Sequence, residues 1–290
     1  MNKIGIDLGG TKIEGVLLDS ENNIIGKKRI DTQKNKGYDY ILNSILSVIK
    51  EISSVTKEQN KIGLGINGTF VKKTGLITHS STGCLIGKNL KADLETKLDK
   101  KVSLENDANC FAMAESILGS GRGYNSVFGV IIGTGVGAGI VINKKLFSGR
   151  SGLAGEWGHH SINPNGKKCY CGNIGCVDTL ISGPSLENRW YELSNQRMSL
   201  KSILNDHSNI HFKQWKSEFL ENFSTGLSNA INIIDPDVIV LGGGLSNIPF
   251  LYDDGKKEVH KKIVGHCAET PIVSNHLGDS SGVLGAALLN

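Results

Sequence analysis

The chain has 290 residues, enough for two α/β domains with buried cores. Its 32 basic and 28 acidic residues give a net charge of only +4 and form no basic block, so nothing favours a nucleic-acid or membrane-surface partner. Glycine is in excess, with 37 residues against a usual share of about 7%. The positions of these glycines therefore guide the interpretation.

The first half of the chain is predicted as a β-meander followed by alternating helices and strands. Strands are predicted over 3–8, 13–19 and 24–30, with a glycine turn between the first two. Apolar residues at helical spacing predict a helix over 40–52, and a strand follows over 62–66. A strand over 102–105 then leads into a helix over 108–118, which ends at Gly119.

The second half opens in the same way. A strand over 127–132, the turn from Gly133 to Gly135 and a strand over 138–143 repeat the strand–turn–strand unit. Helices are predicted over 185–193 and 212–234, a strand over 238–241, and a final helix after Gly282. We interpret the repeat as an internal duplication, with one domain formed by residues 1–108 and 279–290 and a second by 109–278.

Both glycine turns are candidate phosphate cradles. A tight turn presents several backbone N–H groups in one concavity, and glycine lets a polyphosphate approach without a Cβ in the way. One such turn is more often a plain hairpin, but two with matching Gly-Thr sequences favour nucleotide binding. Asp7 would hold Mg²⁺ directly or through water, or would cap its own turn. The candidate ATP and Mg²⁺ residues are Asp7, Gly9, Gly10, Thr11, Lys12, Gly133, Thr134, Gly135, Gly243 and Gly244.

Other nucleotide-binding motifs are excluded. No Gly-Lys pair is followed by Ser or Thr, so the chain has no Walker A loop. Residues 63–68 match G-x-G-x-x-G but open no convincing helix, which argues against a dinucleotide site. Gly243 and Gly244 follow an apolar strand, where they would face an adenosine ring or form a plain strand-end turn.

Asp107 is the candidate catalytic base. It stands where a strand meets a helix, a position that equally suits a helix N-cap. Phosphoryl transfer needs one carboxylate to accept the proton of the attacking hydroxyl, with positioning and magnesium supplying most of the rest. The two glycine turns and the lack of a competing nucleophile pattern favour the base over a cap alone.

Residues 156–176 contain a candidate zinc site made of His159, Cys169, Cys171 and Cys176. Zinc takes four N or S ligands in a tetrahedron, and nearby glycines allow the loop to turn tightly. A disulfide or idle thiols are the alternative, but a CxC pair bridges poorly. Four protein ligands leave no open coordination position, so the zinc would be structural.

The remaining cysteines and the N-terminus indicate the compartment. Cys84, Cys110 and Cys267 are scattered, as expected of a reducing environment. The chain begins with a strand and no signal-peptide pattern, and the weakly polar run over 127–142 is too short for a membrane span. We therefore expect a cytoplasmic protein.

Together these motifs resemble those of the sugar kinases of the ROK family (repressors, open reading frames and kinases), nearly end to end. The resemblance implies an α/β, actin-like (ribonuclease-H-like) duplicated two-domain ATPase fold with ATP and sugar in the cleft between domains. It also implies a small-molecule sugar substrate and a homodimer. The segments that carry it are 7–12, 105–109, 132–135, 155–159, 169–176, 235–237, 241–244 and 278–282.

The resemblance further implies residue roles. Asp107 would take the proton from the sugar 6-hydroxyl, and His159 would face the sugar with the nitrogen that zinc does not bind. Asp178 replaces a usual glutamate that contacts the sugar near C1 and C2, and is one methylene shorter. Asn67 replaces a usual proline, and small residues over 80–84 replace an Asn-rich segment. The implied sugar-binding residues are Gly68, Asn106, Asp107, Glu156, His159 and Asp178.

The shorter Asp178 and the small residues over 80–84 leave space beside C2 of the sugar. We therefore expect ATP-dependent phosphorylation of the 6-hydroxyl of an N-acetylhexosamine, with N-acetylmannosamine preferred and fructose or glucose as alternatives. A sugar-sensing regulator of the same family is disfavoured, because no helix-turn-helix precedes the first strand. A protein that only binds sugar is the remaining alternative.

Overall fold

The computed structural model describes residues 1–56, 58, 60–266 and 269–289, so Cys267 lies outside the described part. The chain forms two compact units. The first contains Met1–Gly123, Gly139–Ala154 and His276–Asn290, and the second contains Tyr124–Ala138 and Gly155–Asn275. Within the described residues, no helix is long and apolar enough to cross a membrane.

The first unit is built on a five-stranded sheet with the strand order β3-β2-β1-β4-β7. The pairs β1–β2 and β2–β3 are antiparallel, whereas β1–β4 and β4–β7 are parallel. The hairpin of β5 and β6 forms a separate two-stranded sheet. The strands are β1 (Asn2–Leu8), β2 (Lys12–Leu18), β3 (Ile24–Asp31), β4 (Asn60–Ile66), β5 (Gly68–Phe70), β6 (Ile77–Ser80) and β7 (Val102–Asn106).

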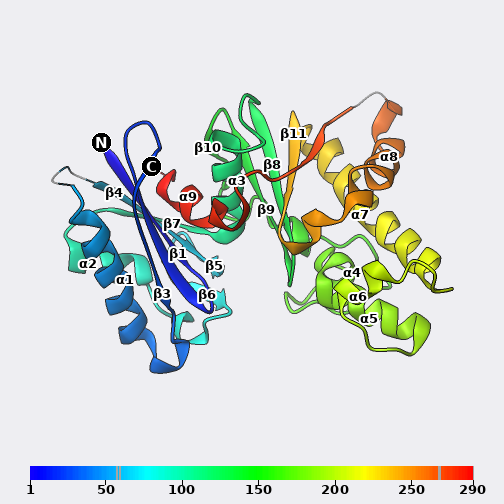
Figure 1. Cartoon of the computed structure of the whole chain (residues 1–290), viewed down its shortest axis with the longest axis horizontal. Helices are drawn as coiled ribbons and strands as arrows, with labels where there is room; N and C mark the ends of the chain where they lie inside the picture. The colour runs from blue at the N-terminus through cyan, green and yellow to red at the C-terminus, as the bar shows by residue number, and fades with distance from the viewer. Residues whose placement is uncertain (57, 59, 267–268, 290) are drawn as a thin grey trace. The chain divides into compact units, whose positions relative to one another are not determined.

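Helices cover both faces of this sheet. Figure 1 shows α1 (Tyr38–Ser53) and α2 (Leu90–Leu98) on one side and α9 (Ser281–Ala287) on the other. α1 buries an apolar stripe that begins at Ile41 and ends at Ile52, at the spacing of a helix that packs on a sheet. α9 packs against β1, β4 and α3 (Asp107–Ile117). The predicted domain boundary after residue 108 would assign most of α3 to the other domain. In the structure α3 clusters with the first unit, because it packs against α9.

The second sheet repeats the arrangement of the first, with the order β10-β9-β8-β11-β12. β10 pairs antiparallel with β9, as β3 does with β2 in the first sheet, and the pairs β8–β11 and β11–β12 are parallel. This shared topology confirms the predicted duplication and the actin-like fold class. The strands are β8 (Ser126–Ile132), β9 (Val136–Ile142), β10 (Lys145–Leu146), β11 (Val238–Gly242) and β12 (Ile272–Ser274).

The helices of the second unit pack around an aromatic core. α7 carries Phe212, Trp215, Phe219 and Phe223 on one face, and neighbouring ring centroids lie 5.8–6.4 Å apart. Trp190 of α5 meets Trp215 edge to face at 6.2 Å. This core fixes the helices that follow the cysteine-rich loop. The helices are α4 (Asp178–Ile181), α5 (Gly183–Ser194), α6 (Leu200–Asn205), α7 (Phe212–Ile234) and α8 (Asp254–Lys261).

Candidate active site

The turn between β1 and β2 presents two neighbouring backbone donors. Gly9 N–H donates to the Lys12 carbonyl at 3.0 Å, and the buried Thr32 pins the turn by donating to the carbonyls of Gly9 (2.7 Å) and Thr11 (2.9 Å). Among the described residues, no acceptor pairs with the N–H groups of Gly10 and Thr11. Two adjacent N–H groups without a protein acceptor form the kind of concavity that binds phosphate oxygens. No local sequence pattern pointed to Thr32, which directly follows β3.

Asp7, at the end of β1, lies in an acidic environment beside this turn. Burial, followed by the charges of Asp107 and Glu14, raises the pKa of Asp7 to about 6. Gly282 of α9 approaches it closely, since a Cβ built there would lie 3.2 Å from Asp7 Oδ2. A buried carboxylate whose pKa is raised by neighbouring carboxylates is a suitable ligand for a hard cation such as Mg²⁺.

Asp107 is the first residue of α3, not its cap. The cap is Asn106, whose Oδ1 accepts the Asn109 N–H at 2.7 Å, so the interpretation of Asp107 as the N-cap is wrong. Asp107 Oδ1 accepts the Ala108 N–H at 2.9 Å, and Oδ2 accepts from Asn67 Nδ2 at 3.2 Å. These two bonds orient the carboxylate. Asn67, the residue found in place of the family's proline, thus holds the candidate base.

Two other predicted sugar contacts in the first unit also have structural tasks. Gly68 is needed where β5 meets β6, because a Cβ there would lie 2.2 Å from the His79 carbonyl oxygen. Asn106 uses its side-chain oxygen for the helix cap, which leaves its NH₂ group as the part able to meet a ligand. Gly10 lies near Ser81, at 3.4 Å from a built Cβ to Oγ. The first turn and the segment over 80–84 are therefore neighbours.

The turn between β8 and β9 reproduces the first. Gly133 N–H donates to the Gly135 carbonyl at 2.9 Å, and the Gly133 carbonyl accepts from Gly183 N–H at 2.8 Å. In the described part of the chain, the N–H groups of Thr134 and Gly135 again have no acceptor. Gly244 N is the nearest atom to a Cβ built on Gly133, at 3.9 Å. The structure thus brings this turn together with the predicted adenosine-facing glycines of the second unit.

Gly243 and Gly244 differ in whether the backbone tolerates a side chain. Gly243 has a φ of 80°, and a Cβ there would lie 2.4 Å from the Ile132 carbonyl oxygen, so its backbone alone demands glycine. Nothing lies within 4 Å of a Cβ built on Gly244. Gly244 is therefore the one of the pair that a ligand can approach.

Asp178 lies at the second turn. Its Oδ1 accepts the N–H of Val136 at 2.8 Å and would be 3.3 Å from a Cβ on Gly135. One oxygen of this carboxylate is therefore used to shape the turn. The shortened side chain has less reach than the glutamate that the resemblance places at the sugar.

The four predicted zinc ligands converge. The ligand atoms of His159, Cys169, Cys171 and Cys176 all lie within 4.8 Å of one another. Cys171 and Cys176 sulfurs are 3.6 Å apart, close to the roughly 3.8 Å between corners of a tetrahedron with Zn–S bonds of about 2.3 Å, and far beyond a disulfide bond of about 2.05 Å. Gly175 allows the loop to close, since its φ is 67° and a Cβ there would lie 1.6 Å from the Asn163 carbonyl oxygen. The donor set fits zinc.

His159 is held from two sides. Nδ1 faces the Cys169 sulfur at 3.6 Å, and Nε2 lies 2.8 Å from the hydroxyl of Tyr170. Burial, followed by the charge of Asp178 and then those of Cys169 and Glu156, raises the pKa of Tyr170 to about 12. Burial also raises the pKa of Glu156, while His159 lowers it. Tyr170 was not among the predicted site residues, because the spacing of the cysteines says nothing about the side chain between them.

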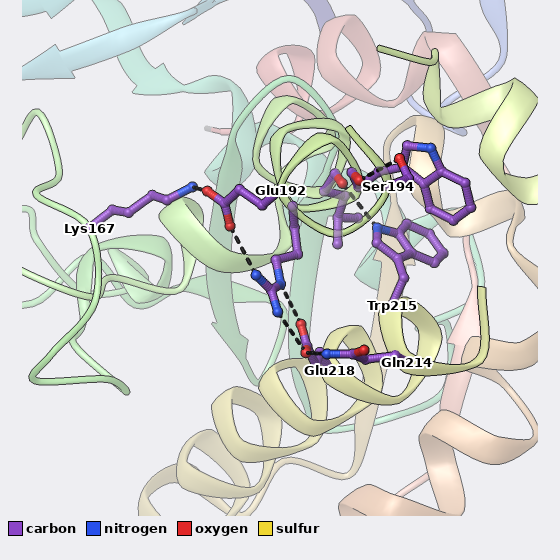
Figure 2. Close-up of polar contacts among 9 residues, drawn as sticks. Lys167, Glu192, Ser194, Gln214, Trp215 and Glu218 are labelled. Atoms are coloured by element: carbon purple, nitrogen blue, oxygen red, sulfur yellow. Dashed lines mark hydrogen bonds and ion pairs between the residues drawn. The ribbon is translucent and has the colours of Figure 1, made fainter. Parts of the chain in front are cut away.

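An ion-pair network anchors the cysteine-rich loop to α5 and α7. Lys167, two residues before Cys169, donates to Glu192 at 2.5 Å (Figure 2). Arg189 donates to Glu192 at 3.1 Å and to Glu218 at 2.5 Å, and so links the two carboxylates. These groups are partly exposed, so each pair contributes little stability alone, but the chain of contacts limits where the loop can lie.

The duplicated sheets and paired glycine turns define an actin-like, ribonuclease-H-like α/β protein. The sequence profile of the ROK family matches residues 3–290. The N-acetyl-D-glucosamine kinase of Pasteurella multocida (strain Pm70) is 34% identical over 304 residues, covering 99% of this chain and 98% of that protein. The chain belongs to the ROK family.

Solved structures of ROK-family proteins have the same fold over the whole length of this chain. The ROK hexokinase from Thermus thermophilus has a TM-score of 0.89 at 27% identity, covering 100% of this chain and 97% of that chain. A ROK family glucokinase from Streptomyces griseus, solved with glucose and AMPPNP, has a TM-score of 0.78 at 26% identity, covering 99% and 98%. The similarity to this fold is therefore not confined to one domain.

Proposed function

We infer that this ROK-family protein is an ATP-dependent sugar kinase, and we propose that its acceptor is the 6-hydroxyl of an N-acetylhexosamine. The observation that carries the proposal is the full-length relationship to N-acetyl-D-glucosamine kinases, 34% identical in the Pasteurella protein. The two turns with unpaired N–H groups and the oriented Asp107 supply the chemistry that such a reaction needs.

N-acetyl-D-glucosamine is the acceptor that the relatives support. The sequence favoured its C2 epimer, N-acetylmannosamine, because of space beside C2, but that argument cannot separate two sugars that carry the same acetamido group. The name of the Pasteurella relative points to the gluco isomer. Fructose and glucose, which lack the acetyl group, are the alternative acceptors.

In the proposed reaction, Asp107 accepts the proton of the 6-hydroxyl as the oxygen attacks the γ-phosphorus of ATP, the bond from that phosphorus to the β–γ bridging oxygen breaks, and ADP leaves. Asn67 and the Ala108 N–H orient its carboxylate. The paired N–H groups at Gly10 and Thr11, and at Thr134 and Gly135, bind phosphate oxygens. Lys12 and the hydroxyls of Thr11 and Thr134 add donors, and Gly244 accommodates the nucleoside. Asp7 would hold Mg²⁺, which would neutralise charge on the phosphates.

On the sugar side, the NH₂ group of Asn106 and the carboxylate of Glu156 are the proposed partners of ring hydroxyls. The zinc would be structural, and its task is to fix the position of His159. Gly68 serves by letting the chain pass close to β6. The homodimer implied by the resemblance stays a prediction.

A coupled ADP-release assay over N-acetyl-D-glucosamine, N-acetylmannosamine, glucose, fructose and mannose tests the proposal. We expect the best N-acetylhexosamine to exceed glucose and fructose in kcat/KM by at least about tenfold, because a pocket that accommodates the acetamido group gains contacts a plain hexose lacks. A panel led by glucose or fructose would refute the substrate and leave the kinase standing. ATP binding without turnover on any sugar would refute the kinase.

A further inference from the structure

The first unit contains a cavity of about 710 Å³. Its wall comes from the loop between β5 and β6, from α2, β7, α3 and β10, and from the residues that follow α9. Among the described residues that line it, none is proposed to bind ATP, Mg²⁺ or the sugar. A volume of this size is typical of a site for a small molecule, so we considered which ligand the lining suits.

Apolar side chains form one part of the lining. Leu104 of β7, Met113 of α3 and Leu288 after α9 are 6%, 7% and 5% exposed. Phe70 and Leu146 are partly exposed at the same cavity. A ligand that covers these groups with its own apolar surface removes both from water, which favours binding. A purely ionic ligand would leave this part of the lining uncovered.

The charged side chains at the cavity are mostly positive. They are four lysines, Lys72, Lys91, Lys144 and Lys145, and one glutamate, Glu105. Glu105 Oε1 lies 3.8 Å from Lys72 Nζ and compensates that charge. In the part of the chain that the structure describes, the other three lysines form no ion pair. Three positive charges beside one cavity attract anions, because their fields add.

Lys144 lies in an unfavourable backbone conformation. Asn143 and Lys144 form the two-residue turn between β9 and β10, with φ values of 51° and 61°. Two positive φ values in such a turn favour Asn followed by Gly, because a side chain is disfavoured at the second position. Lysine in place of glycine therefore lowers stability here and adds an ammonium group at the cavity. Local strain of this kind is often found where a side chain has a function.

We propose that this cavity is a second binding site, for a small organic anion with at least two negative charges next to an apolar ring or chain. The lysines without an ion pair bind the charged group, and the apolar lining packs against the ring or chain. A phosphate monoester of an aromatic or aliphatic alcohol has this chemistry. The proposal is independent of the proposed function, because no residue of the proposed active site takes part in it.

The test uses 1-naphthyl phosphate, which carries nearly two negative charges at pH 8 on an apolar ring. Isothermal titration calorimetry of the full chain is run with saturating AMPPNP and Mg²⁺, so that nucleotide occupies the phosphate-binding turns. We expect a Kd at least about tenfold lower than those of inorganic phosphate, which lacks the ring, and of 1-naphthol, which lacks the charge.

The double variant Lys144→Gln/Lys145→Gln tests whether the probe binds at this cavity. It removes two of the positive charges, so the Kd for 1-naphthyl phosphate should rise at least roughly fivefold, and more at low salt than at high salt. Lys50→Gln/Lys61→Gln is the matched control, at two exposed lysines of the first unit that do not line the cavity. It should leave the Kd unchanged, and AMPPNP should bind both double variants as it binds the wild type.

Each component of the proposal has an outcome that would overturn it. An unchanged Kd in Lys144→Gln/Lys145→Gln, or no binding of 1-naphthyl phosphate once AMPPNP is bound, would show that the cavity is not the site. Inorganic phosphate binding as tightly as 1-naphthyl phosphate would exclude recognition of an apolar group. Equally tight binding of 1-naphthol would exclude recognition of the charge.

Discussion

Asp107 gives the sharpest test of the chemistry at the scale of single residues. Asp107→Asn removes the base at nearly constant volume, and the helix keeps its cap because Asn106 provides it. We expect kcat to fall at least roughly a hundredfold, while the urea midpoint of unfolding barely changes. Asp39→Asn, in the first turn of α1, is the matched control and should retain full turnover. If Asp107→Asn keeps more than about a tenth of wild-type kcat, the base lies elsewhere.

The raised pKa of Asp7 predicts that its negative charge lowers the free energy of unfolding at high pH, although magnesium binding needs that charge. The pKa of Asp7 is raised from the ordinary 3.8 to about 6 in the folded protein, so folding favours the protonated form. The stability linked to this proton is present at low pH and is lost as the pH rises through about 6. Without Mg²⁺, Asp7→Asn should therefore be more stable than the wild type by about 1–3 kcal/mol at pH 8 and by less at pH 5.

Urea unfolding of both proteins at the two pH values measures this difference. The same substitution should remove most activity, because it replaces the proposed magnesium ligand. A stability difference that is the same at pH 5 and pH 8 would show that the Asp7 charge is not responsible.

Among the larger elements, the cysteine-rich loop leads to a prediction about zinc content and sugar affinity. Cys171→Ser leaves three ligands, so zinc content should fall below the one ion per chain expected for the wild type. Sugar affinity should drop by roughly tenfold or more, because the ion is proposed to fix His159. ATP affinity should change less, since Gly183 also holds the nearby turn at Gly133.

Ser208→Ala, at an exposed residue of the second unit outside the cluster, is the control for this experiment and should leave both affinities unchanged. The zinc hypothesis fails if protein purified without chelators holds no metal. It also fails if complete removal of the metal leaves sugar affinity as it was.

Elements with a long apolar period were predictable, whereas short or polar ones were not. The structure places α7 at Phe212–Ile234, the predicted range, because its aromatic residues recur at three- and four-residue spacing. β12 has only three residues and is defined by pairing with β11, which no local pattern reports. α8 is mostly charged and buries little beyond Gly255 and Val259, so its periodicity is weak.

At the scale of the whole molecule, repetition made the fold predictable. Two strand–turn–strand units in one sequence predicted two sheets of the same topology, and the structure has them. The motifs also pointed to the two turns, to Asp107 and to the four His and Cys residues whose ligand atoms converge. The contacts that orient these groups escaped prediction, because Asn67 to Asp107, Asp178 to Val136 and Tyr170 to His159 depend on side-chain positions across loops.

The packing of α9 has a consequence for how the protein is made. α9 lies against β1 and β4, with Val283 and Ala287 fully buried, and a Cβ on Gly5 of β1 would lie 2.1 Å from the Val283 carbonyl oxygen. A ribosome releases residues 281–287 only after the whole second unit has left the exit tunnel. One face of the first sheet therefore stays uncovered throughout translation of the second unit, and the unit begun first is the one completed last.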